Sequence, residues 1–147
     1  MRFWLQYHNY DNLAYLPSGY ETDIEDLSTL DTSNFELSCV TTAKSAIRNA
    51  INDVVFLIVG YGKKPKKYVL WSWFFIDEVE ENPGVEFNAF GKGEVLNPLP
   101  LLIGEEFDEF KRQMANFSLG FINVSNRPYT QNLIELAKER GGFKVLQ

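Results

Sequence analysis

Residues 52–80 contain two long apolar segments joined by a lysine-rich turn, and this pattern constrains the fold more than any other. Residues 54–60 are apolar almost throughout, and residues 68–79 carry large apolar side chains on both faces of a predicted strand. Gly62 and Pro65 between them predict a hairpin turn over 61–67. A strand that is apolar on both faces must be covered on both. We therefore predict an α+β fold with a small, curled, mostly antiparallel β-barrel and three to four helices packed outside it.

Hydrophobic periodicity predicts the rest of the chain. Residues 9–34 are rich in polar residues, glycine and proline, so we expect a long loop with one helical turn near 24–30. Thr41 or Thr42 is expected to cap the first helix, and Thr130 the last. Residues 81–101 read mostly as loop around one short strand. The remaining predicted elements are strands at 2–7, 85–90 and 117–124, and helices at 43–51, 105–115 and 130–141.

Length and composition indicate one domain over residues 1–147. The longest apolar runs are far shorter than the roughly 20 residues that cross a bilayer, so no membrane association is expected. Cys39 is the one cysteine and has no internal disulfide partner. A cytoplasmic location is therefore predicted.

The net charge of −6 argues against a protein that grips nucleic acid mainly by releasing counterions. A local basic patch is compatible with it. Four lysines lie within five positions of the predicted hairpin turn, where they could contact a nucleic-acid backbone or could simply be solvated. These are Lys63, Lys64, Lys66 and Lys67.

Few residues favour an enzyme. His8 and Cys39 are the only histidine and cysteine, and a nucleophilic pair would need both to meet across the fold beside an orienting Asn9 or Asp11. A zinc site needs more histidine or cysteine ligands than these two. Gly91, Lys92 and Gly93 lack the spacing of a phosphate-binding loop. We therefore expect no catalytic residue, no metal and no cofactor.

The order of the predicted elements, together with three short segments, resembles the EVE-like branch of the PUA-like superfamily. Phe3 to Leu5 reads FWL, similar to the YWL of the family's first strand. Residues 52–56 read NDVVF, similar to a GD-x-V-x-F-Y pattern, with Asn52 where glycine is usual. Residues 71–80 match a long strand with an aromatic and acidic end.

The resemblance implies a non-catalytic binding module that holds a flipped or modified base of a nucleic acid in an aromatic pocket at the barrel mouth. Trp4 would be a cage wall, and Tyr61 would close the pocket. The start of the first helix would supply hydroxyls, backbone amides and a cation. Trp4 and the two threonines also have ordinary roles, as core and as helix cap. The ligand-binding candidates are Trp4, Asn9, Tyr10, Thr41, Thr42, Lys44 and Tyr61.

The alternative hypothesis is a module for protein interaction or self-association. In that case the acidic surface and the side chains of Phe87, Phe90 and Tyr129 would dock a partner protein or a second copy. A pocket shared by Trp4 and Thr42 would favour base binding, and a flat exposed apolar patch would favour docking.

Overall fold

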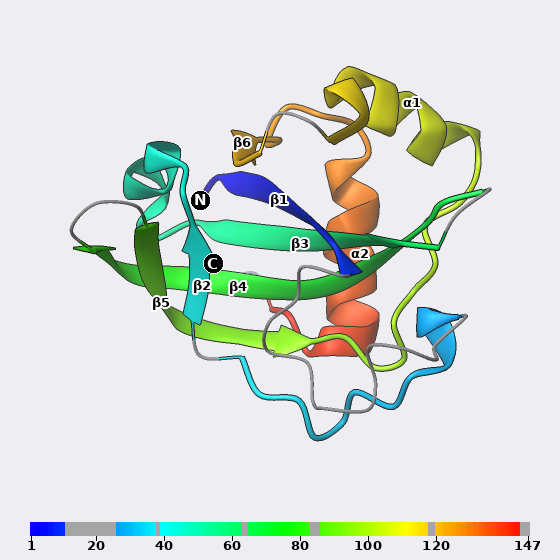
Figure 1. The fold of residues 1–147 in the computed structure, drawn as a ribbon, viewed down its shortest axis with the longest axis horizontal. Helices are drawn as coiled ribbons and strands as arrows, with labels where there is room; N and C mark the ends of the chain where they lie inside the picture. Colours follow the sequence, from blue (N-terminus) through cyan, green and yellow to red (C-terminus); the bar gives the residue numbers. More distant parts are fainter. Residues whose placement is uncertain (11–25, 38, 63–64, 83–85, 118–119, 145–147) are drawn as a thin grey trace.

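The protein is built on one curled sheet of six strands in the order β2-β5-β4-β3-β1-β6 (Figure 1). The computed structural model describes residues 1–10, 26–37, 39–62, 65–82, 86–117 and 120–144. The strands are β1 Phe3–Asn9, β2 Cys39–Thr42, β3 Val54–Tyr61, β4 Lys67–Asn82, β5 Glu86–Val95 and β6 Ile122–Asn123. The helices are α1 Glu105–Gln113 and α2 Thr130–Gly141, with 3₁₀ helices η2 Leu27–Thr29, η3 Ser45–Ala50 and η4 Ala115–Phe117.

The centre of the sheet is the hairpin of β3 and β4 with β1 beside it. β1 runs parallel to β3, with Leu5 opposite Phe56, and all other pairs are antiparallel. Every residue of β3 is buried. Because side chains alternate along a strand, β1 sends Leu5 to one face of the sheet and Trp4 and Gln6 to the other.

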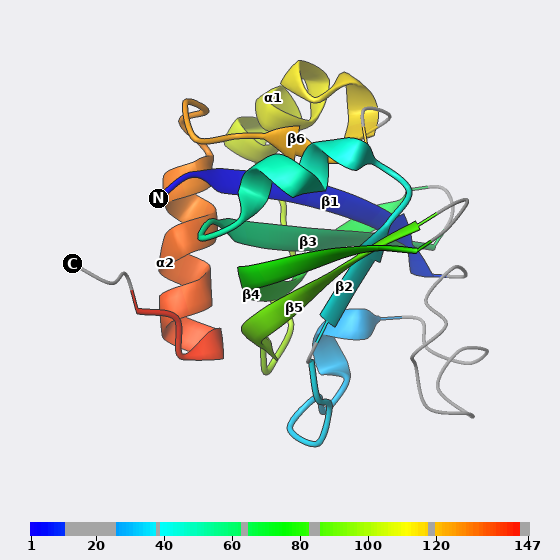
Figure 2. The same ribbon diagram turned by 90° about the vertical axis from the view of Figure 1, so that its left-hand side faces the viewer.

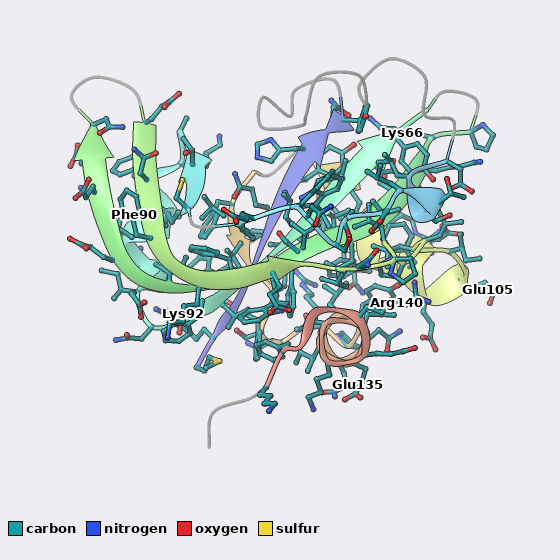
Figure 3. The ribbon with its side chains drawn as sticks, turned by 90° about the horizontal axis from the view of Figure 1, so that it is seen from below. Lys66, Phe90, Lys92, Glu105, Glu135 and Arg140 are labelled. Carbon is teal, nitrogen blue, oxygen red and sulfur yellow. The ribbon has the colours of Figure 1, made fainter. Side chains whose placement is uncertain are left out.

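A bend in β4 and β5 curls the sheet. The pairing of these strands shifts between Ile76 and Glu78, which marks a β-bulge, and bulges increase local twist and bend the strand. Gly91 and Gly93 of β5 lie where a Cβ would collide with backbone atoms of β4, so the strands can approach closely only because both positions are glycine. Figure 3 shows both strands turning through this bend. The bend carries β2 over the concave face of the sheet.

Each face of the sheet has its own apolar core. The larger cluster packs Phe56 and Trp71 of the sheet against Leu133 of α2 and Phe107 of α1. Figure 2 shows α2 standing across this side of the sheet, with α1 above it. The smaller cluster lies on the other face and is covered partly by η3. It contains Trp4, Ile47, Ala50, Val55, Phe74, Ile76, Phe87, Ala89 and Phe121.

The structure confirms the coarse prediction of an α+β fold with a curled sheet. The predicted strands at 2–7, 54–60 and 68–79 and the helices at 105–115 and 130–141 are present within a few residues of their predicted bounds. No helix in the described ranges is long and apolar enough to cross a membrane. Most of the predicted loop 9–34 lies outside the described residues, although its helical turn is found as η2.

The predicted β-barrel is present as a curled half-barrel, which stays open because β2 and β6 are its two edges in the described chain. Three local predictions were wrong. Thr41 and Thr42 belong to a strand rather than to a helix cap, and the helix after them is the shorter 3₁₀ helix η3. The predicted strand 85–90 extends through its glycines to Val95. The predicted strand 117–124 shrinks to β6, because Phe117 ends the 3₁₀ helix η4 with positive φ and Gly120 also has positive φ.

Hydrogen bonds to Asp53 connect the start of β1 to the turn before β3. Its buried carboxylate accepts hydrogen bonds from the Trp4 indole (3.0 Å), from the Arg2 backbone N–H (2.8 Å) and from the Arg2 guanidinium (3.0 Å). The indole nitrogen therefore has its partner inside the protein. Trp4 is held as a structural residue, stacked on Phe121.

We expect Asp53→Ala to lower the free energy of unfolding by about 2–3 kcal/mol, because the Trp4 and Arg2 N–H groups lose their acceptor. Urea denaturation measures the change. The control is Glu81→Ala, which removes an exposed carboxylate 3.8 Å from Arg48 and should cost no more than about 0.5 kcal/mol. Equal losses in the two variants would contradict this role for Asp53.

Candidate functional site

A cavity of about 630 Å³ lies between β1 and β2 on the concave face of the sheet. We call it the β1–β2 pocket. Its polar lining includes Gln6 and His8 from β1 and Thr41 and Thr42 from β2, with Lys44 just beyond β2. β1 and β2 are separated in the sheet by three strands, so the curl alone brings them face to face. The volume falls within the range of roughly 300–1,000 Å³ typical of small-molecule sites.

The carboxamide of Gln6 spans the gap between the two strands. Gln6 is only 5% exposed, and its Nε2 donates to the Thr41 carbonyl oxygen (2.9 Å). The same nitrogen lies 2.9 Å from Nε2 of His8. An amide nitrogen only donates, so it uses one hydrogen for each of these partners. Its Oε1 accepts no hydrogen bond from any residue in the described ranges.

His8 is held as a neutral imidazole. Its Nε2 accepts from Gln6, which places the ring proton on Nδ1. Burial lowers the pKa of His8 below its usual 6.5, because the charged form is poorly solvated in the pocket. Gln6 and His8 both line the pocket from one face of β1, and their remaining polar atoms are an acceptor, Gln6 Oε1, and a donor, His8 Nδ1–H.

Lys44 supplies a cation at the β2 side of the pocket, whereas Gln6 and His8 line it from β1. Thr42 Oγ1 accepts a hydrogen bond from the Lys44 backbone N–H (3.1 Å), which fixes the chain as it leaves β2. The Lys44 side chain runs along Gly120, where φ is +77° and a Cβ would collide with the lysine. Glu86 is the one carboxylate among the described lining residues.

Other groups that line the pocket are mainly apolar. Leu37, Val40 and Leu57 contribute aliphatic surface, and Tyr7 is the single aromatic residue of the described lining. Burial raises the pKa of Tyr7 to about 12, so its hydroxyl stays protonated. Exposed Cys39 also lines this pocket, on the strand facing His8. No group of three or more metal-binding side chains occurs within the described ranges.

The structure brings three predicted ligand-binding residues to this pocket: Thr41, Thr42 and Lys44. Trp4 lies instead in the smaller core cluster, and Tyr61 and Tyr10 lie in the larger one. The Tyr61 hydroxyl donates to Asp26 (3.0 Å). Burial, followed by the nearby Asp26 carboxylate, raises the Tyr61 pKa to about 12. Trp4, Thr42 and Tyr61 therefore do not meet in this cavity.

The predicted basic patch is only partly described. Lys63 and Lys64 lie outside the described residues. Lys66 is exposed, hydrogen-bonds to Asn9 Oδ1 and lies over the Tyr7 ring. Lys67 is exposed at the start of β4. Asn9 Oδ1 also accepts from the Tyr7 hydroxyl (2.9 Å), so Asn9 links Tyr7 and Lys66.

The aromatic residues of the docking hypothesis are mostly inside the protein. Phe87 and Tyr129 are buried, and Phe90 is half-buried. The large apolar side chains that are exposed in the described ranges are Met1, Ile51, Leu101 and Ile103.

Gln6 and His8 were not predicted from the sequence as pocket residues. Their signal was the spacing: Trp4, Gln6 and His8 are two apart on a strand, so they share one face, and two polar residues there are unusual beside a buried tryptophan. In comparisons with known proteins, no family model, curated protein or solved structure matches this chain.

We expect Gln6→Leu to speed hydrogen exchange at the backbone amides of residues 39–42, because β2 loses its side-chain link to β1 while the apolar volume is kept. The free energy of unfolding should fall by about 1–2 kcal/mol. Gln131→Leu, which removes an exposed hydrogen bond on α2, should leave exchange in β2 unchanged. Unchanged exchange in Gln6→Leu would show that the amide does not hold β2.

His8 is the only histidine, so the NMR signals of its ring C–H groups are assigned without ambiguity and their titration reports its pKa directly. We expect a folded-state pKa below 6.5. The unfolded chain then takes up the proton first as the pH falls, so stability declines from about pH 6.5 down to the folded-state pKa. Urea midpoints across this window should fall for the wild type and remain flatter for His8→Gln. A measured pKa at or above 6.5 would contradict a neutral, half-buried His8.

Proposed function

We propose that this protein is a non-catalytic binding module that takes a nucleobase, as a modified nucleotide or as a base turned out of a nucleic acid, in the β1–β2 pocket. The same proposal includes membership of the EVE-like branch of the PUA-like superfamily and a cytoplasmic location. The observation that carries the binding proposal is the pairing of Gln6 and His8 inside a cavity large enough for a nucleotide.

The chemistry of the pocket suits a flat heterocycle with a polar edge. A base presents donors and acceptors side by side on that edge, and Gln6 Oε1 and the Nδ1–H of His8 are a complementary acceptor and donor. The aliphatic surface of Leu37, Val40 and Leu57 suits the apolar faces of such a ring. This differs from the expected aromatic cage, since Trp4 and Tyr61 are committed to the cores.

Lys44 is the lining residue suited to a phosphate. It is exposed at the pocket and carries the only full positive charge of the described lining, because His8 is neutral. The net charge of −6 gives the protein as a whole no long-range attraction for nucleic acid. Recognition would thus depend on the base and one phosphate rather than on many backbone contacts, and its affinity would vary little with salt.

The test is a calorimetric titration with the four common ribonucleoside monophosphates and with their base-methylated forms, each beside the matching nucleoside. We expect Lys44→Ala to weaken a bound nucleotide about three- to fivefold and to leave the nucleoside unchanged, because an exposed cation contributes little beyond its phosphate contact. Gln6→Leu should weaken both. Lys92→Ala on β5 removes an exposed lysine that does not line the pocket and is the matched control.

Two results would contradict the proposal. One is the absence of saturable binding by every compound at millimolar concentration. The other is binding that Lys44→Ala and Lys92→Ala weaken equally, or that Gln6→Leu leaves intact, since the ligand would then lie outside the β1–β2 pocket.

A further inference from the structure

A second pocket, of about 470 Å³, lies between α1 and the start of α2. We call it the α1–α2 groove. It shares no described lining residue with the β1–β2 pocket. Its walls carry the carboxylates of Glu105, Glu106 and Glu109, and no lysine, arginine or histidine is among its described lining residues. Figure 3 shows Glu105 on α1, across the molecule from Phe90 of β5.

The carboxylates of the groove form few ion pairs and hydrogen bonds with other described residues. Glu109 pairs with the exposed Arg112, and Glu106 accepts a weak hydrogen bond from Asn132 (3.3 Å). Glu105 has no ion pair in the described part of the chain. Acidic residues in the first turn of α1 interact favourably with the helix dipole. Asp108 also lies in this turn but does not line the groove, so a favourable dipole interaction does not require the carboxylates to line it.

Tyr129 supplies an independent sign of a ligand. The residue is only 9% exposed and lines the groove, with its ring stacked on Phe110 at a centroid distance of 5.1 Å. None of the residues that the structure describes forms a hydrogen bond with its hydroxyl. Burial, followed by the negative charge of Glu106, raises the Tyr129 pKa to about 12. Tyr129 therefore lines this carboxylate-rich groove with a neutral hydroxyl that has no hydrogen-bond partner among the described residues.

We propose that the α1–α2 groove binds a lysine or arginine side chain of a partner polypeptide. The carboxylates would neutralise the ammonium or guanidinium group, the Tyr129 hydroxyl would accept one of its hydrogens, and the rings of Phe110 and Tyr129 would pack against its methylene groups. Ile103, two residues before Glu105, is 74% exposed and offers an apolar contact for the chain on either side of the bound residue. An apolar contact beside a cation site favours a polypeptide over a free polyamine.

The experiment is an NMR titration of the isotope-labelled protein with a capped peptide of alternating lysine and leucine, beside spermidine and Mg²⁺ at matched ionic strength. We expect saturable shift changes confined to residues 105–113 and 128–132 with the peptide. Glu106→Gln should weaken the peptide at least fivefold, and Tyr129→Phe about threefold, since it keeps the ring and removes only the hydroxyl. Ile103→Ser should weaken the peptide and not spermidine.

Asp108→Asn is the matched control, because it removes the same charge from the same helical turn outside the groove. It should change the affinity less than twofold. An equal effect of Asp108→Asn and Glu106→Gln would overturn the site in favour of general surface attraction. Binding of spermidine or Mg²⁺ without the peptide would overturn the polypeptide partner, and shifts centred on the β1–β2 pocket would overturn the location.

Discussion

The hydrogen bond from the Gln6 amide to the Thr41 carbonyl holds together the two parts of the structure on which the candidate site depends. β2 lies at the edge of the sheet and pairs along one side only, with β5. Across the concave face, one hydrogen bond between described residues joins it to β1, from the Gln6 side chain to the Thr41 carbonyl. A backbone ladder would bring the strands to about 4.8 Å and leave no cavity. A glutamine side chain spans a wider gap, so the strands are joined and the space between them is kept.

The position of β2 is set elsewhere, by the way β4 and β5 bend. The bulge after Ile76 and the two glycines of β5 let the long hairpin turn through the curve that carries β2 back over the sheet. A flatter hairpin would leave Thr41 beyond the reach of Gln6. The pocket is therefore a consequence of strand curvature, and Lys44 reaches it because the chain leaves β2 at that end.

The sequence predicted well those elements whose burial pattern is strong, and poorly those decided by partners far along the chain. The apolar hairpin and the amphipathic helices follow from local periodicity. β2 has a half-buried, polar pattern, and only pairing with β5 makes Thr41 and Thr42 extended. The family resemblance placed Lys44 beside a ligand at the start of a helix, whereas in the structure it follows strand β2 and precedes the 3₁₀ helix η3. Trp4 was open to two interpretations, and its burial and its hydrogen bond to Asp53 favour the structural one.

The distribution of charge bears more on function than the net value of −6 does. In the β1–β2 pocket the half-buried imidazole of His8 stays neutral, so the described lining carries one cation, Lys44, and one carboxylate, Glu86. In the α1–α2 groove, three carboxylates have only Arg112 as an ion-pair partner among the described residues. Charges separated by more than about 10 Å of solvent are largely screened at physiological salt. Two ligands of opposite charge can then bind to one acidic protein. The electrostatic energy of each bound ligand is set by the side chains within a few ångströms of it, and not by the net charge.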